Sequence, residues 1–148
     1  MSDTTGKTAP RTVLGFDFGG KRIGVAVGQE LTASTQSLAT VAVINGKPDW
    51  PHISRLLEQW QPALIIVGLP LNMDGSEQEV TRAARRFGHR LNGRYNLPVE
   101  MVDERLTSYE AEEILTEQRR AGQRRKHSRK AAIDQMAAEL IIKTWFSQ

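Results

Sequence analysis

The sequence contains no cysteine, so neither a disulfide framework nor a thiolate metal site is possible in this chain. That absence suits a reducing compartment, and we expect a cytoplasmic protein. The chain also lacks any apolar run approaching the roughly 20 residues needed to cross a bilayer, and residues 1–11 have no apolar segment of the kind found in secretory signals. We therefore expect no membrane association, a disordered tail over residues 1–11 and a single domain over residues 12–148.

The composition is that of a globular protein, with 39% hydrophobic and 25% charged residues in a chain of 148. The net charge is only +3, but the positive charge is concentrated in two places. Residues 119–130 carry basic and no acidic side chains, and residues 82–90 carry a second group of arginines. Such clusters indicate an anionic partner.

The most informative stretch is Thr12–Gly28, in which two apolar runs flank Gly19-Gly20-Lys21-Arg22. Two adjacent glycines between β-type runs are typical of a tight hairpin. Because side chains alternate across a strand, Asp17 points away from the face that holds Phe16 and Phe18. A lone acid in a core strand is costly to desolvate, so it usually pairs with a cation or a metal, although an Asp on a wet sheet face is the simpler alternative.

The remaining periodicities predict an α/β fold, with five strands and four helices along the chain. Ser76 and Glu79 have the spacing of a capping box for the second helix, and Thr107 and Glu110 for the third. The predicted strands are Val13–Phe18, Ile23–Val27, Ser37–Ile44, Ala63–Leu69 and Leu97–Val102, and the predicted helices cover Asp49–Trp60, Glu77–Asn92, 107–118 and Ser128–Phe146.

The second predicted helix has one apolar side and one basic side. At about 100° per residue, the basic side gathers Arg82, Arg85, Arg86, His89 and Arg90 without an acid between them. A solvated helix face is the common explanation for such a stripe, and phosphate contact is the functional one.

The last predicted helix places Asp134 within an otherwise apolar arc, between Ile141 and Trp145. Leaving such an acid unpaired in a core would cost several kcal/mol, so Asp134 has either a functional role or a partner in a buried salt bridge or helix cap.

Three distant segments thus each offer one carboxylate: Asp17, either Asp103 or Glu104, and Asp134. Strand periodicity alone does not choose between Asp103 and Glu104, since neighbours face opposite ways. Carboxylates brought together repel one another unless a hard cation lies between them, and Mg²⁺ or Mn²⁺, as one or two ions, prefers such ligands. This chemistry suits phosphodiester hydrolysis.

The segments FDFGGKRIGVAVG, IIVGLPLNMDGS, VDERLTS and KAAIDQMAAELI, in that order, resemble the YqgF (RuvX) family of pre-16S rRNA nucleases, also described as Holliday-junction-resolvase-like. The resemblance spans roughly Val13 to Trp145. It implies a ribonuclease-H-like three-layer fold with a central mixed five-stranded sheet flanked by helices. It also implies Asp17, Glu104 and Asp134 as catalytic residues and metal ligands, and a cytoplasmic role in maturing the 5′ end of 16S rRNA. Gly20 departs from the larger residue that many relatives carry.

The expected nucleic-acid contacts are polar or basic side chains of the hairpin, the loop after the fourth strand, the basic helix and the basic segment: Lys21, Arg22, Asn72, Arg82, Arg85, Arg86, Arg124, Arg125, Lys126, Arg129 and Lys130. For Asn72 a simple turn is the alternative.

Structured RNA, namely pre-16S rRNA, is the favoured partner, and branched DNA is the alternative. A resolvase should be a symmetric dimer, whereas the sequence shows no heptad seam, so we expect a monomer or weak homodimer. Two other classes remain open: a non-catalytic nucleic-acid-binding or transcription-associated factor, and a nucleotide-binding ATPase, which would need a second domain.

Overall fold

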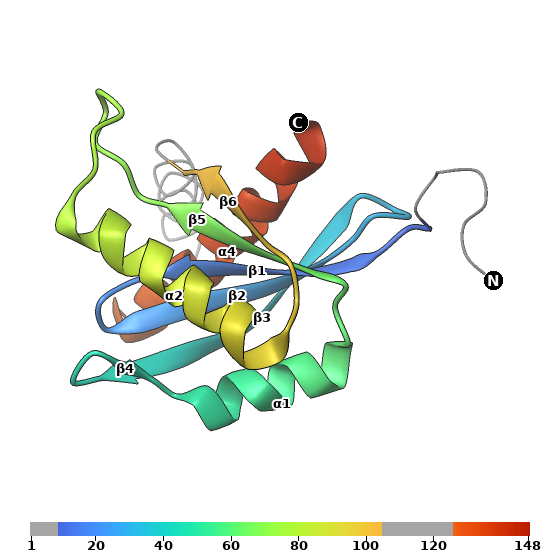
Figure 1. Cartoon of the computed structure of the whole chain (residues 1–148), viewed down its shortest axis with the longest axis horizontal. Helices are drawn as coiled ribbons and strands as arrows, with labels where there is room; N and C mark the ends of the chain where they lie inside the picture. Colours follow the sequence, from blue (N-terminus) through green and yellow to red (C-terminus); the bar gives the residue numbers. More distant parts are fainter. Residues whose placement is uncertain (1–8, 105–125) are drawn as a thin grey trace.

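The computed structural model describes residues 9–104 and 126–148. These residues form six strands and three helices, labelled as in Figure 1: β1 (Thr12–Phe18), β2 (Arg22–Gln29), β3 (Ser34–Ile44), β4 (Lys47–Pro48), α1 (Trp50–Trp60), β5 (Leu64–Leu69), α2 (Glu79–Tyr95), β6 (Val99–Asp103) and α4 (Lys126–Ser147). The predicted helix over residues 107–118 lies outside the described residues.

The strands form one mixed sheet in the order β4-β3-β2-β1-β5-β6. Strands β1 to β4 pair antiparallel, and β5 and β6 join β1 in parallel. The α/β class and the mixed sheet are confirmed, but the predicted number of five strands is wrong. Asn45 and Gly46 both have positive φ, the geometry of a tight hairpin turn, and they fold Lys47–Pro48 back onto β3 as a sixth strand.

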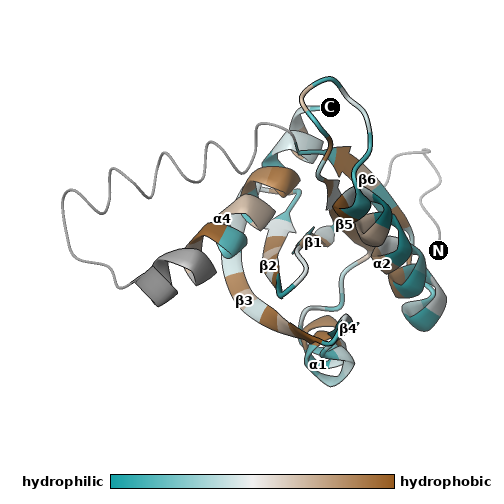
Figure 2. Ribbon diagram, turned by 90° about the vertical axis from the view of Figure 1, so that its left-hand side faces the viewer, coloured by the Kyte–Doolittle hydropathy of each residue, from teal (hydrophilic) through white to brown (hydrophobic). Residues whose placement is uncertain are grey.

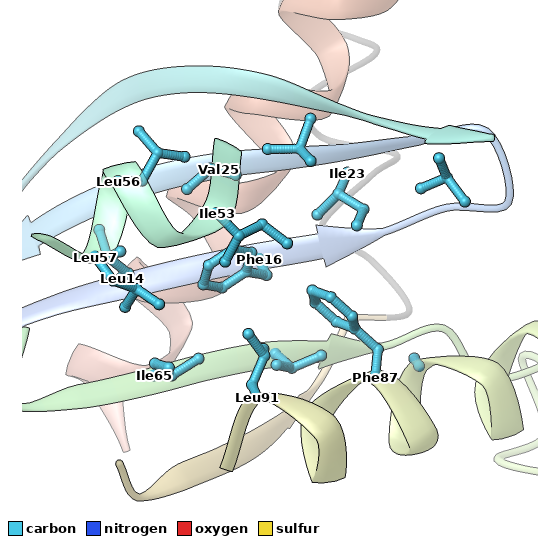
Figure 3. Close-up of a cluster of buried hydrophobic side chains, with 14 of the residues drawn as sticks. Leu14, Phe16, Ile23, Val25, Ile53, Leu56, Leu57, Ile65, Phe87 and Leu91 are labelled. Atoms are coloured by element: carbon cyan, nitrogen blue, oxygen red, sulfur yellow. The ribbon is translucent and has the colours of Figure 1, made fainter. Parts of the chain in front are cut away.

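Helices cover both faces of the sheet (Figures 1 and 2). Helix α4 packs on one face, over a small cluster that includes Val13, Ile66 and Ile141. Helices α1 and α2 pack on the other face over the larger cluster, where Phe16 and Phe87 meet edge to face with ring centroids 5.7 Å apart (Figure 3). The expected three-layer arrangement is therefore present.

The N-terminal cap of α2 differs from the predicted one. Gln78 is the N-cap, and it exchanges side-chain and backbone hydrogen bonds with Thr81. Ser76 is not available as a cap because its backbone N–H and its hydroxyl both donate to the carboxylate of Asp74, at 2.9 and 2.6 Å. A local turn therefore uses the hydroxyl that the sequence pattern assigned to the helix.

The described chain begins within the expected tail. Arg11 forms an ion pair with Glu30, with 3.0 Å between Nε and Oε1, and its guanidinium lies over the Trp145 ring. Within residues 9–104 and 126–148, no helix combines the length and apolar character needed to cross a bilayer.

Because β1, β5 and β6 run parallel, their carboxyl ends at Phe18, Leu69 and Asp103 lie at one edge of the sheet (Figure 1). In open α/β sheets this edge is where ligands bind. The fold therefore gathers the ends of three strands at a single place.

Candidate active site

Asp17 lies near the carboxyl end of β1 and on the face covered by α4. Val13 belongs to the cluster under α4, whereas Leu14 and Phe16 belong to the opposite cluster, so the alternation along β1 puts Asp17 on the α4 side. The orientation predicted from the sequence, opposite to Phe16 and Phe18, is confirmed.

A glycine lets α4 bring Asp134 to this place. Gly24 is paired with Asp17 across the β1–β2 hairpin, and a Cβ on Gly24 would lie 2.0 Å from the backbone oxygen of Asp134. Real Cβ atoms do not approach an oxygen so closely, so only glycine allows the helix to rest on the strand here. Asp134 is half-buried beside Asp17 as a result.

Glu104 follows the last residue of β6, and its backbone N–H donates to the carbonyl of Leu69. Its side chain is only 3% exposed, and its carboxyl lies over Gly68, where a Cβ would be 2.8 Å from Cδ. Asp103, the alternative from the sequence, is exposed. Of these two acids, Glu104 is the one that lies beside Asp17.

The ionised forms of Asp17 and Glu104 are both disfavoured in this site. Burial raises the pKa of Asp17 to about 6, with the charge of Asp134 adding to the shift and a hydrogen bond with Glu104 offsetting part of it. Burial, followed by the charge of Asp17, raises the pKa of Glu104 to about 10. When both carboxyls are ionised neither can donate, and neither oxygen of Glu104 has a hydrogen-bond donor in the described chain. This pair needs a positive charge or a proton.

Asp134 is held differently, because Arg22 donates from Nε to its Oδ2 at 2.6 Å. The salt bridge that the sequence left open as an alternative is therefore present, but it is only partly buried. Within residues 9–104 and 126–148, no three acidic or histidine side chains are arranged to hold a metal ion together. The structure thus brings Asp17 and Glu104 into contact, and Asp134 lies beside them in an ion pair with Arg22.

The four arginines in the basic stripe of α2 divide into two pairs. Arg82 and Arg85 form ion pairs with Glu79 and Glu77, at 3.0 and 2.8 Å. Arg86 and Arg90 are exposed and have no ion pair within the described residues; together with Phe18, Pro48 and Phe87 they line a pocket of about 160 Å³.

The other expected nucleic-acid contacts fall in three regions. Lys21 is exposed at the β1–β2 hairpin, and Asn72 is exposed while its amide donates to Ser76 within the loop after β5. Lys126, Arg129 and Lys130 fall in the first turns of α4, and Arg124 and Arg125 lie outside the described residues.

The sequence analysis missed two features of this site. One is the pair of strand glycines, Gly24 and Gly68, which make room for Asp134 and Glu104. Glycines inside strands were the available signal, since they often mark the close approach of another segment. The other is Arg90, which belonged to the basic stripe but not to the expected nucleic-acid contacts.

We expect Gly24→Ala to destabilise the protein by roughly 2–4 kcal/mol, because the new methyl would overlap backbone atoms of α4 that cannot swing aside. Thermal unfolding measures the effect. The matched control is Gly20→Ala in the same hairpin, where a Cβ would meet nothing within 4 Å. Equal melting temperatures for the two variants would contradict the close approach of α4 to β2.

A mixed sheet covered by helices on both faces is the arrangement of the ribonuclease-H-like fold. The RuvC structure from T. thermophilus in complex with a Holliday junction substrate shares this fold: it superposes with a TM-score of 0.52 over 91% of this chain and 93% of that one, at 16% identity. The family model described as "RuvX: Holliday junction resolvase" matches residues 11–148, and the chain belongs to this family.

Relatives at much higher identity carry another name. A protein of Nitrosococcus oceani named "Putative pre-16S rRNA nuclease" is 56% identical over 99% of this chain and 93% of its own length. A protein of Saccharophagus degradans with the same name is 48% identical over 93% of this chain and 94% of its own length. The predicted family, the ribonuclease-H-like fold and the assignment as a nuclease, a hydrolase acting on ester bonds, are confirmed.

Proposed function

We propose that the protein hydrolyses phosphodiester bonds at the edge formed by Asp17, Glu104 and Asp134, with Mg²⁺ or Mn²⁺ as cofactor. The observation that supports this most strongly is the pairing of the buried Glu104 carboxyl with the half-buried carboxyl of Asp17. Both oxygens of Glu104 are buried without a donor in the described chain, against a second acid. Two adjacent acids with this desolvation penalty do not serve stability, because an apolar residue in place of either acid would remove the penalty.

The residues present fit a hard divalent cation. Mg²⁺ and Mn²⁺ prefer carboxylate oxygens, and such an ion would favour the ionised forms whose pKa values burial, and after it the neighbouring charges, now raise. Asp17 and Glu104 would hold it, and Asp134 is the adjacent third ligand. When bound, one or two such ions activate water and stabilise the leaving oxygen of a phosphodiester.

The chain's own contribution is to fix these acids and to bind the nucleic-acid backbone. Strand β1 and the end of β6 set Asp17 and Glu104 on rigid elements, so little reorganisation is needed at the reacting phosphate. The pocket between α2 and the β3–β4 hairpin offers Arg86 and Arg90 for a phosphate, with the Phe18 ring as an apolar wall. Phe18 follows Asp17 at the end of β1 but points to the opposite face, so this pocket lies on the α2 side of the same sheet edge.

For the substrate we propose pre-16S rRNA, processed at its 5′ end in the cytoplasm. The relatives at 56% and 48% identity carry this substrate in their names, whereas the RuvC structure with its Holliday junction is only 16% identical. The large exposed hydrophobic side chains of the described residues, Leu31, Ile44 and Met73, lie in separate turns and strand ends. Their separation favours a monomer or weak homodimer over the symmetric dimer that a resolvase needs.

The test offers the purified protein a 5′-extended 16S precursor RNA and a four-way DNA junction in parallel, each with Mg²⁺, Mn²⁺ or EDTA. We expect metal-dependent cleavage of the RNA. Cleavage of the junction alone would keep the nuclease and refute the RNA substrate. No cleavage of either, with RNA binding intact, would favour a non-catalytic nucleic-acid-binding factor.

The two pairs of arginines on α2 provide a second prediction. We expect Arg86→Gln/Arg90→Gln to weaken RNA binding about tenfold and to lower the slope of log affinity against log salt by about 1 to 2. Arg82→Gln/Arg85→Gln removes the same charge, but these arginines already have acidic partners, so we expect a loss of about twofold. Equal losses measured by filter binding would mean that only net charge matters.

A further inference from the structure

The ion pair between Arg22 and Asp134 links the β1–β2 hairpin to helix α4 at the site itself. Arg22 is the first residue of β2, and its carbonyl accepts the backbone N–H of Gly19, which closes the hairpin. The side chain of Arg22 is 39% exposed and that of Asp134 is 18% exposed. A guanidinium therefore lies at the edge where Asp17 and Glu104 meet, and part of it faces solvent.

This contact has a consequence for cation binding. An aspartate that accepts a charge-assisted hydrogen bond at 2.6 Å has given one carboxylate oxygen to the arginine. In the described part of the chain, Asp17 and Glu104 then remain as the pair open to a cation, and three ligands are not assembled. Oδ1 of Asp134 is not part of this contact, so the restraint lies in the position at which Arg22 holds the carboxylate, which leaves the three acids unassembled.

We propose that Arg22 is a positioning residue that withholds Asp134 from the cation until a phosphodiester takes its guanidinium. The inference rests on the proposed function, because it assumes a cation at the carboxyl pair. A phosphate presents the same bidentate acceptor geometry as a carboxylate, so it is a direct competitor for the guanidinium. Substrate binding at Arg22 and cation binding at the acids are then coupled, and by linkage each strengthens the other.

For a phosphate to replace Asp134 at the guanidinium of Arg22, the ion pair must be short and must also be accessible to solvent. Arg22 meets this requirement, since its side chain reaches solvent and its partner is the more buried of the two. Lys21, next to it in the hairpin, is exposed and forms no ion pair in the described residues, so it carries a similar charge without the same contact. The two side chains provide a matched comparison in which only one restrains Asp134.

The experiment measures Mn²⁺ binding to the full chain without nucleic acid, by the loss of the free Mn²⁺ resonance, for wild type, Arg22→Gln and Lys21→Gln. We expect Arg22→Gln to bind Mn²⁺ about fivefold or more tightly than wild type, a coupling of ordinary size. Lys21→Gln should change the affinity by less than about twofold, because it alters only the long-range field.

A second arm measures the anisotropy of a labelled phosphorothioate oligoribonucleotide with and without Mn²⁺. We expect Mn²⁺ to tighten its binding to wild type several-fold and to have a much smaller effect on Arg22→Gln. Equal Mn²⁺ affinities for Arg22→Gln and Lys21→Gln would overturn the role of Arg22 while leaving the metal site intact. Absence of Mn²⁺ binding by all three proteins would refute the metal site itself, and the role of Arg22 with it.

Discussion

Replacing Asp17 with asparagine is expected to lower metal-dependent cleavage by roughly 100- to 1,000-fold while the fold is retained. The amide has nearly the same shape as the carboxyl but carries no charge, so it weakens both cation binding and the field at the reacting phosphate. Retention of the fold follows from burial, because the charged form of Asp17 is the disfavoured one in this site. Single-turnover cleavage of the precursor RNA, with circular dichroism of both proteins, measures the two effects.

The control for this variant is Asp103→Asn. Asp103 is adjacent to Glu104 in the chain and has the same charge, but it is exposed and contributes only a minor part of the shift in the Glu104 pKa. We expect a change of less than about threefold. A loss of cleavage in Asp103→Asn as large as that in Asp17→Asn would mean that Asp103, and not Glu104, is the acid that acts with Asp17.

The second large effect is on stability, where Glu104→Gln should stabilise the metal-free protein at pH 8. The pKa of Glu104 rises from 4.5 to about 10 on folding. The folded state therefore binds more protons than the unfolded state, and stability falls as the pH rises from the unfolded pKa through the folded one. At pH 8 the cost is on the order of 5 kcal/mol, which the neutral amide avoids while donating to Asp17.

The measurement is thermal unfolding in EDTA from pH 5 to pH 9. We expect the melting temperature of Glu104→Gln to exceed that of wild type by roughly 10–20 °C at pH 8, and the two to converge towards pH 5. With Mn²⁺ the gap should narrow, because the cation stabilises most the protein that binds it most tightly. A wild type that is as stable as the variant at pH 8 in EDTA would contradict the buried, uncompensated carboxyl pair.

Local patterns predicted the part of the site that lies on a regular element. The alternation along Thr12–Phe18 was sufficient to place Asp17 opposite Phe16, because a strand has only two faces. The helical period of the last helix likewise singled out Asp134, because it places this acid within an apolar arc. Both inferences depend on a period within one element, which the sequence contains.

The remaining features depend on contacts between elements. Glu104 could not be chosen over Asp103 from strand period, since the predicted strand gave no indication of which face α4 covers; the structure shows Val102 under α4, and Glu104 follows two residues later. The ion pair of Arg22 with Asp134 joins residues 112 positions apart. The two-residue strand β4 was missed because its pairing depends on a turn and not on a hydrophobic pattern.

The most direct test of the carboxyl pair as a cation site is Mn²⁺ binding to wild type and Glu104→Gln, measured by calorimetry at pH 8 with the full chain. We expect saturable binding by wild type and at least tenfold weaker binding by Glu104→Gln, since the variant removes the most buried anionic ligand. Equal affinities for the two proteins would contradict the assignment of Asp17 and Glu104 as the place where the cation is held.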